Sequence, residues 1–308
     1  MTDAELYPLS FEPIFKPQVW GASRLAALGK TLPAGQRIGE SWELVDLPDD
    51  QSVVRQGSLS GRTLEQLVGE LGERLLGPVA LDGGRFPLLV KYIDASQTLS
   101  VQVHPDAAVA ASLGGRPKSE AWYIMDADPD AALYLGLQPG TTARALSAAL
   151  EAGEVERLVS RVAVRPGDLF PVPPGTVHAI GAGVLLAEVQ QPSDTTYRVY
   201  DWGRMGLDGQ PRELHVEQAM QSIHFDARPA SPVRKGRVEM GLFSIDLLED
   251  PDTAYDGEGP AVLVGLEGRL QVQGVSCGPG DTLLVPHAIR RARINTEGHA
   301  RAMWVTFG

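Results

Sequence analysis

The sequence predicts a mostly β protein in which short strands form a barrel or a two-layered sandwich. Glycine (34 residues) and proline (23 residues) are spread along the 308-residue chain, where they separate short runs rich in valine, leucine, isoleucine and threonine. Because glycine and proline end strands and shape turns, this composition is typical of many short strands in series. A weak internal repeat further indicates that the chain contains two related β units.

Two stretches interrupt the β pattern with helical spacing. The first has leucines at positions 64, 67, 71 and 75, and it follows Thr63 and Gln66, which have the spacing of a capping box. The second has leucines at positions 146, 150 and 158, between Thr142 and Arg161. We expect both to form amphipathic helices that cover a sheet.

Seven segments have the composition and length of strands. They are Phe86–Asp94, Leu99–His104, Ala121–Met125, Ala131–Leu137, Asp168–Val172, Val184–Gln190 and Thr196–Asp201. The second of these, in the stretch LSVQVHPD, alternates most regularly. Because successive side chains of a strand point to opposite faces, Ser100, Gln102 and His104 share one face and three apolar residues share the other. Two structures would explain this alternation: a surface strand with its polar face in water, or a strand whose polar face supplies the ligands of a binding site.

The internal repeat links two stretches that begin with Gly-Asp and continue to Val-Pro. GDLFPVPPGTVHAIGAG starts at Gly167, and GDTLLVPHAIRRARI starts at Gly280. When the prolines are aligned, Arg291 of the second copy stands opposite His178 of the first. We therefore predict a catalytic domain over residues 1–214 and a degenerate β domain over 215–308, with the junction between about Asp208 and Val238. We expect the second unit to cover the apolar face of the 99–104 strand.

Composition and charge exclude several classes of protein. The formal net charge of −12 opposes binding of extended nucleic acids, although a local cationic pocket is still compatible with a small anion. No apolar run reaches the roughly 20 residues of a membrane span. The chain has a single cysteine, Cys277, and no stretch with a signal-peptide pattern, so we expect a cytoplasmic protein.

The first copy of the repeat fits the pattern G-x5-P-x-G-x2-H, with Gly167, Pro173, Gly175 and His178. This spacing resembles the second motif of the cupin superfamily, in which the other metal ligands come from an earlier pair of strands. The resemblance implies a cupin-type barrel or jelly roll that carries a metal site, with a degenerate second unit and a few covering helices. Two imidazoles, a carboxylate and an amide oxygen, from His104, His178, Glu120 and Gln102, suit a zinc-like divalent ion.

A narrower resemblance rests on several motifs in order. QVHPD, KSEAWYI, PPGTVHAIG and QQPSDTTYRVYDWGR, together with VWG at Val19 and GESWE at Gly39, resemble type I mannose-6-phosphate isomerases in their short bacterial form. The resemblance extends from about Pro13 to Phe307 and weakens after Val238. The additional helical domain of the long form has no counterpart in this sequence.

This resemblance implies an aldose–ketose isomerase that interconverts mannose 6-phosphate and fructose 6-phosphate through an enediol, with one divalent metal, Zn²⁺. Gln102, His104, Glu120 and His178 would be the zinc ligands, and Arg198 the active-site arginine. Lys118 and Lys91 would serve ring opening and proton transfer, and Ser100 would contact the substrate. A lysine accepts a proton only when it is uncharged, and a nearby cation favours that form. There are alternatives to these roles. Either lysine could be a solvated surface charge, and Arg198 could be a structural arginine paired with a carboxylate.

Two rival functions use the same fold. A cupin metal site can activate oxygen, and a cupin can bind a sugar without converting it. Bound iron and oxygen consumption would indicate the first, and binding without turnover the second. Free mannose in place of the sugar phosphate also stays open. The oligomeric state is not fixed by the sequence, and a monomer is our working expectation. We assign no role to His215, His224, His287 and His299.

Overall fold

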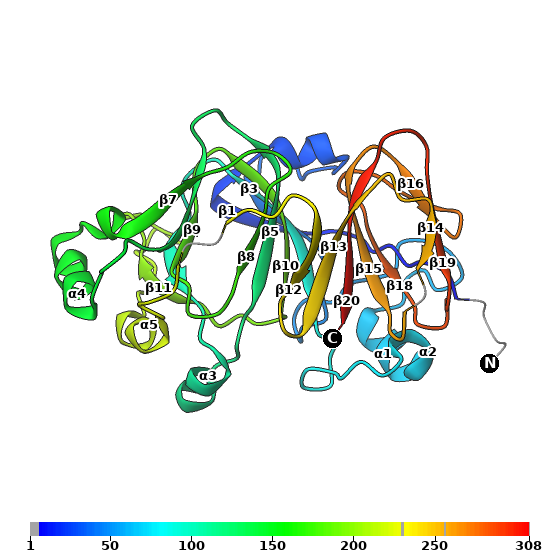
Figure 1. The fold of residues 1–308 in the computed structure, drawn as a ribbon, viewed down its shortest axis with the longest axis horizontal. Coiled ribbons are helices and arrows are strands. Elements are labelled where there is room, and N and C mark those ends of the chain that lie inside the picture. Colours follow the sequence, from blue (N-terminus) through cyan, green and yellow to red (C-terminus); the bar gives the residue numbers. More distant parts are fainter. Residues whose placement is uncertain (1–5, 229–230, 256, 308) are drawn as a thin grey trace.

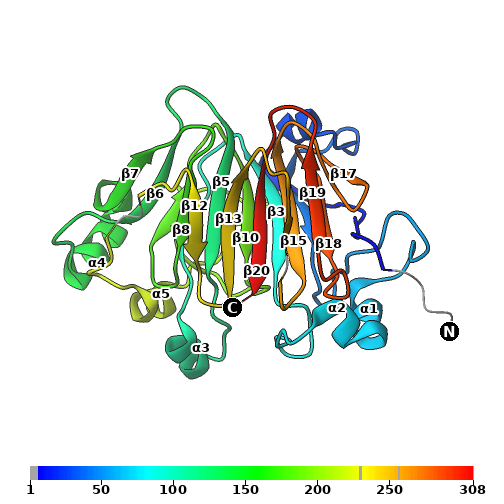
Figure 2. The same cartoon turned by 45° about the vertical axis from the view of Figure 1, so that its right-hand side comes forward.

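Two β-barrels lie side by side in the computed structural model, which describes residues 6–228, 231–255 and 257–307 (Figures 1 and 2). The first barrel packs a six-stranded sheet, ordered β1-β2-β3-β10-β5-β8, against a five-stranded sheet, ordered β11-β4-β9-β6-β7. Its strands are β1 (Ile14–Ala22), β2 (Ile38–Leu44), β3 (Leu89–Ala95), β4 (Val101–Val103), β5 (Glu120–Ala127), β6 (Ala132–Leu137), β7 (Val159–Ala163), β8 (Leu169–Val172), β9 (His178–Ile180), β10 (Val184–Gln190) and β11 (Tyr197–Tyr200). All of their pairings are antiparallel.

The second barrel repeats this plan with fewer strands. Its sheets are ordered β12-β13-β20-β15-β18 and β14-β19-β16-β17. The strands are β12 (Gly236–Glu239), β13 (Phe243–Glu249), β14 (Thr253–Tyr255), β15 (Ala261–Glu267), β16 (Leu270–Val272), β17 (Val275–Cys277), β18 (Thr282–Val285), β19 (Ala292–Thr296) and β20 (Arg301–Phe307). The order β13-β20-β15-β18 matches β3-β10-β5-β8 of the first barrel.

The predicted internal repeat is confirmed by the position of its two copies. β8 and β18 are the edge strands of equivalent sheets, and each follows the turn that its Gly-Asp pair makes. Gly167 (φ +94°) and Gly280 (φ +88°) both have left-handed backbone conformations, which favour glycine. The mostly β, cupin-type fold predicted from the sequence is therefore correct.

Short helices cover the ends and one face of the barrels (Figure 1). They are η1 (Arg24–Leu28), α1 (Leu64–Leu71), α2 (Glu73–Leu76), α3 (Ala107–Leu113), α4 (Ala143–Ala152), η2 (Val155–Leu158) and α5 (Val216–Ser222). The predicted capping box at the start of α1 is present, with Thr63 accepting from the Gln66 backbone amide. Among the described residues, none of these helices is long and apolar enough to cross a bilayer.

The two barrels share one core, formed where their larger sheets face each other. Side chains of the first barrel, such as Tyr92 and Ala187, are in one buried cluster with Ile245, Val262 and others of the second. The expected covering of the β4 strand by the second unit is therefore wrong. Val101 and Val103 pack in a separate cluster with α4 and α5 residues, including Leu146 and Ala219.

Early segments of the chain pack against the second barrel. Leu9 and Leu284 exchange two backbone hydrogen bonds of 2.8 Å. The backbone amides of His287 and Ala288 donate to the carbonyls of Leu75 and Arg74 at 3.0 and 2.9 Å. The helices α1 and α2 consequently lie beside β18 and β19, although they precede most strands of the first barrel in the sequence (Figure 1).

Candidate active site

A cavity of about 560 Å³ opens between the two sheets of the first barrel. From the larger sheet, β2, β3, β5 and β10 contribute Glu40, Lys91, Glu120 and Glu188. From the smaller sheet, β4 and β11 contribute Gln102 and Arg198. The alternation of strand side chains explains this convergence, because each of these residues occupies an inward position in its strand.

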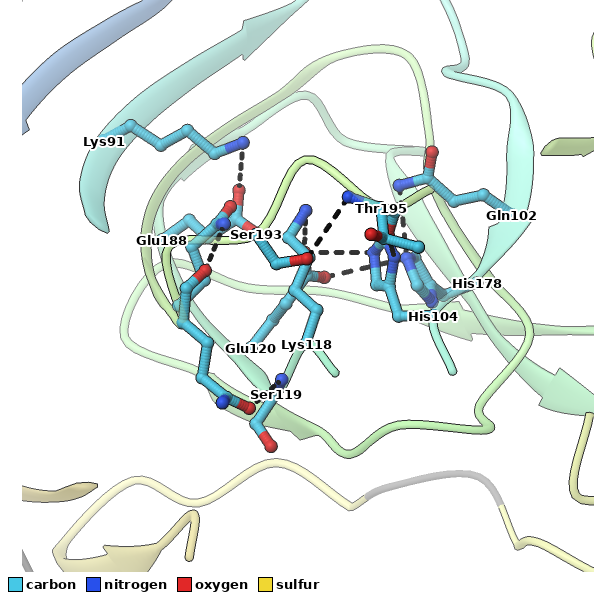
Figure 3. A network of polar contacts seen from close by, with 12 residues as sticks. Lys91, Gln102, His104, Lys118, Ser119, Glu120, His178, Glu188, Ser193 and Thr195 are labelled. Carbon is cyan, nitrogen blue, oxygen red and sulfur yellow. Dashed lines mark hydrogen bonds and ion pairs between the residues drawn. The ribbon is translucent and has the colours of Figure 1, made fainter. Parts of the chain in front are cut away.

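Three buried side chains, His104, Glu120 and His178, meet beside the cavity (Figure 3), and Glu120 is the one that lines it. His104 Nε2 lies 3.2 Å from Glu120 Oε1, and His178 Nε2 lies 3.6 Å from Glu120 Oε2. His104 follows β4, Glu120 is the first residue of β5 and His178 the first of β9. All three are only 1% exposed, so water competes little for their lone pairs.

Hydrogen bonds on the far side of each imidazole fix its protonation. His104 Nδ1 contacts the Thr195 carbonyl at 2.9 Å, and His178 Nδ1 contacts the Thr176 carbonyl at 2.8 Å. A carbonyl only accepts, so each Nδ1 carries the proton and each Nε2 presents a lone pair. Burial lowers the pKa of both histidines, in the case of His178 to about 4, so both imidazoles are neutral at pH 7.

The donor set fits a divalent cation. His104 Nε2 and Glu120 Oε2 are buried atoms that form no hydrogen bond within the described part of the chain. Lone pairs that face one another without a proton between them repel, and a cation removes that repulsion. Gln102 lies next to this set: its side-chain amide is 3.2 Å from His178 Nε2, and the two residues are opposite each other in the pairing of β4 with β9. As a ligand it would use its carbonyl oxygen.

Two lysines flank this cluster in different ways. Lys118 Nζ lies 2.8 Å from Glu120 Oε1. Lys91 Nζ lies 3.0 Å from Glu188 Oε2 and 3.5 Å from Glu40 Oε2. Burial by itself lowers the pKa of Lys91, but the Glu188 and Glu40 carboxylates outweigh it and the pKa is raised. Lys91 is therefore held as an ammonium ion.

Glu188 and Glu40 were not among the residues that we predicted from the sequence. Burial and the nearby Glu120 carboxylate raise the pKa of Glu188 to about 7. Glu188 interrupts the strand VLLAEVQ, whose seven residues are all buried. A lone charged residue in such an apolar run is a usable sequence signal, because an isolated buried carboxylate is costly.

Ser100 and Arg198 also line the cavity, as their predicted roles require. Arg198 is directly opposite Gln102 in the pairing of β11 with β4. Its Nη1 donates to the Glu213 carbonyl at 2.8 Å, whereas its buried Nε has no hydrogen-bond acceptor among the described residues. His215, to which we assigned no role, lines the same cavity together with Arg212. Both residues lie after the end of the family motif QQPSDTTYRVYDWGR, and nothing in the sequence around them indicated that they line the cavity.

The barrel and its buried His–Glu–His cluster define a cupin-type protein with a divalent-metal site. Comparison with known proteins narrows this class. Residues 9–134 match the family model of the phosphomannose isomerase type I catalytic domain. The chain is 39% identical to the mannose-6-phosphate isomerase ManA of Bacillus subtilis, covering 96% of this chain and 98% of the relative. It is 35% identical to the mannose-6-phosphate isomerase of Streptococcus mutans, covering 92% and 93%.

Solved structures agree with these relatives. The crystal structure of the mannose 6-phosphate isomerase from Bacillus subtilis superposes with a TM-score of 0.83 and 30% identity, covering 98% of this chain and all of that one. A mannose 6-phosphate isomerase bound with zinc and yttrium has the same fold, with a TM-score of 0.71 and 18% identity over 98% of this chain and 100% of that one. The chain therefore belongs to the type I phosphomannose isomerase family, and it is an isomerase.

Proposed function

We propose that this cavity interconverts mannose 6-phosphate and fructose 6-phosphate. One observation carries the proposal: Glu120 faces the lone pairs of His104 and His178 on one side, and it lines the same cavity as Lys118, Lys91 and Arg198. A metal-stabilised enediol reaction needs this combination of ligands, proton carriers and a fixed positive charge. The names of the relatives supply mannose 6-phosphate, and fructose 6-phosphate is the ketose that its aldose–ketose isomerisation gives.

Gln102, His104, Glu120 and His178 would hold the Zn²⁺. When bound, the ion supplies Lewis-acid stabilisation of the negative charge that develops on the sugar oxygens. The bonds from His104 and His178 to backbone carbonyls keep both rings oriented toward Glu120. These residues therefore create a pre-organised site, and loss of either imidazole removes a quarter of its ligands.

Lys118 is our candidate for the proton transfer between C2 and C1. Its Nζ contacts the Glu120 carboxylate at 2.8 Å, which places it beside the ligand set and inside the cavity. Its side chain is only 7% exposed, so bulk water has little access to the transferred proton. The substrate C2 proton would pass to this amine and return to C1 as the ketose forms.

Lys91 is our candidate for ring opening. An ammonium ion held by Glu188 and Glu40 is a proton donor, so Lys91 can protonate the ring oxygen as the sugar opens. Arg198 presents a permanent positive charge to the enediolate oxygens, and its position opposite Gln102 keeps it near the ligands. Ser100, two residues before Gln102 and also lining the cavity, would donate to a sugar hydroxyl.

Purified protein should convert mannose 6-phosphate to fructose 6-phosphate in a coupled assay. We expect chelation to abolish turnover and added Zn²⁺ to restore it, because the ligand set consists of neutral imidazoles and a carboxylate. Folded, zinc-loaded protein without turnover would indicate a sugar-binding role, and oxygen consumption with bound iron would indicate an oxygenase.

The ligand and arginine roles predict different losses. His178→Ala should lose bound metal, measured by elemental analysis after gel filtration, and with it all turnover. Arg198→Ala should keep the metal but lower kcat/KM by about 100-fold, since one charge-stabilising donor contributes about that much. An active His178→Ala variant with a full complement of metal would contradict the ligand assignment.

We also propose that the protein acts in the cytoplasm on this small sugar phosphate, without nucleic-acid or membrane partners. The net charge of −12 and sequence pI of about 5.0 support this proposal, because they disfavour anionic polymers and anionic membrane surfaces. A monomer remains the working expectation for the oligomeric state, and sedimentation velocity would measure it.

A further inference from the structure

Positive charge is concentrated at one rim of the cavity, beyond the ligand cluster. The segment 201–215 folds back on β11, with Arg212 bound to Asp201 through its Nε at 2.7 Å and its Nη2 at 2.5 Å. Arg204 uses the same carboxylate at 2.7 Å, and Arg198 lies beside them. Two guanidinium groups thus bind one buried carboxylate and that of Arg198 lies beside them, which leaves a local surplus of positive charge.

The neighbouring groups do not neutralise this surplus. Glu213 offers Arg198 a backbone carbonyl, and its carboxylate, 83% exposed, lies 3.9 Å from His215 Nε2, where solvent weakens the attraction. Asp194 also lines the cavity, but it is exposed to solvent. Burial and the Arg212 charge lower the pKa of Arg198, and they outweigh the Asp201 and Glu213 carboxylates, which raise it. An anion bound at this rim would relieve the repulsion between these two guanidinium groups.

The order of residues across the sheet separates this rim from the ligands. Arg198 has Gln102 on one side, and on the other side it pairs with His215, whose backbone amide donates to the Arg198 carbonyl at 2.8 Å. The Arg198 amide in turn lies 3.4 Å from His215 Nδ1, so Nδ1 accepts and Nε2 carries the proton. His215 is therefore a hydrogen-bond donor on the side of Arg198 that faces away from the metal ligands.

We infer that Arg212 and His215 bind the phosphate of the sugar phosphate, and that Arg212 makes the enzyme prefer mannose 6-phosphate over free mannose. This inference rests on the proposed function for its substrate. Asp201 holds the Arg212 fork in place, as pre-organised phosphate recognition requires. A sugar whose carbonyl end reacts beside Gln102 and Arg198 extends its far end, which carries the phosphate, toward this rim.

The test compares Arg212→Met with Arg212→Lys and with Arg204→Met as the matched control. Arg204 binds the same Asp201 carboxylate and the Thr98 carbonyl, but it does not line the cavity. Isothermal titration calorimetry of zinc-loaded protein would use mannitol 6-phosphate, which cannot isomerise, and mannitol. Thermal melting of each variant reports whether the fold is intact.

We expect Arg212→Met to weaken mannitol 6-phosphate binding about 10-fold to 100-fold, because a charged hydrogen bond is removed. Arg212→Lys should recover part of that loss, mannitol binding should not change, and Arg204→Met should stay within about twofold of the parent. In the coupled assay, the ratio of kcat/KM for mannose 6-phosphate to that for mannose should fall by the same factor in Arg212→Met.

Unchanged mannitol 6-phosphate binding by Arg212→Met would overturn the inference, as would an equal loss in Arg204→Met. These outcomes are separate from failure of the proposed function. A parent protein that binds mannitol 6-phosphate through Arg212 but converts no mannose 6-phosphate would keep the phosphate site and refute the isomerase. If the parent converts mannose 6-phosphate and Arg212→Met converts it equally well, the isomerase function stands and the phosphate site is refuted.

Discussion

Buried charges inside apolar strands build the candidate site. Lys91 and Glu188 stand directly opposite each other in the pairing of β3 with β10, in strands whose residues are all buried. Each would be costly alone, and the pair is tolerated because the ions satisfy each other. Lys91 could be identified in the sequence through a family motif. That Glu188 is its partner became evident only from the register of β3 with β10, which places the two residues opposite each other.

Glu188→Gln removes the carboxylate closest to the Lys91 ammonium ion. We expect zinc to stay bound and kcat to fall by about 100-fold, within the range that one general acid contributes. Glu40→Gln is the matched control, because its contact with Lys91 is longer, 3.5 Å against 3.0 Å, and its effect should be smaller. Loss of zinc from Glu188→Gln, or equal effects of the two variants, would count against this role of Glu188.

The buried His178 should make stability depend on pH in the chelated protein. Burial lowers its folded pKa from 6.5 to about 4, so between these values the unfolded chain binds a proton that the folded chain does not. Stability therefore falls as the pH falls through this window. In urea unfolding at several pH values, His178→Gln should flatten that fall. Parallel pH profiles for the parent and His178→Gln would contradict this account.

The sequence predicted most elements of the first barrel, and glycines account for the principal differences. Both predicted helices are interrupted, the first at Gly72 (φ +46°) and the second at Gly153 (φ +69°), where the backbone leaves the helical region. After Gly153 the chain forms η2 and then β7, which the leucine spacing did not distinguish from a longer helix. β1, β2 and β9 were missed because their runs lack clean alternation.

Two glycine-to-alanine variants should change stability in opposite directions. At Gly181, which follows β9, an added Cβ would lie 2.1 Å from the Ala132 carbonyl oxygen, so the strand that carries His178 must shift. We expect Gly181→Ala to lose stability and to bind zinc more weakly. At Gly69, inside α1, the added Cβ meets no atom within 4 Å, and Gly69→Ala should gain about 0.5–1 kcal/mol. Urea unfolding and zinc titration measure both, and a neutral Gly181→Ala would refute the close contact.

At the scale of the molecule, sequence reasoning predicted the fold class, the family, the isomerase activity and the zinc cofactor, and the comparisons confirm them. The site roles and the boundary between residues 214 and 215 stay predictions. The helix α5 lies just beyond that boundary, yet it packs against β4 and β11 of the first barrel. The contact between the barrels could not be predicted from the sequence. A strand with apolar residues on both faces is buried on both, but its sequence does not identify the element that covers each face.

The shared core predicts that the barrels unfold together. Ile245 is fully buried in the cluster that contains side chains of both barrels. We expect Ile245→Ala to cost about 2–5 kcal/mol and to lower the stability of β3 and β10 as much as that of β13. Hydrogen exchange followed by mass spectrometry measures each strand. Protection lost only in the second barrel would show that the barrels are independent.

The bridge between Leu9 and Leu284 can form only after nearly the whole chain has been synthesised. At about 5–20 residues per second, the partner of Leu9 leaves the ribosome roughly 15 to 55 s after Leu9 does. β3 and β10 emerge during that interval, and from then until its end their apolar faces that pack against the second barrel lack their cover. The nascent chain must therefore be kept from aggregating until its last strands emerge, and the rate of translation sets how long that exposure lasts.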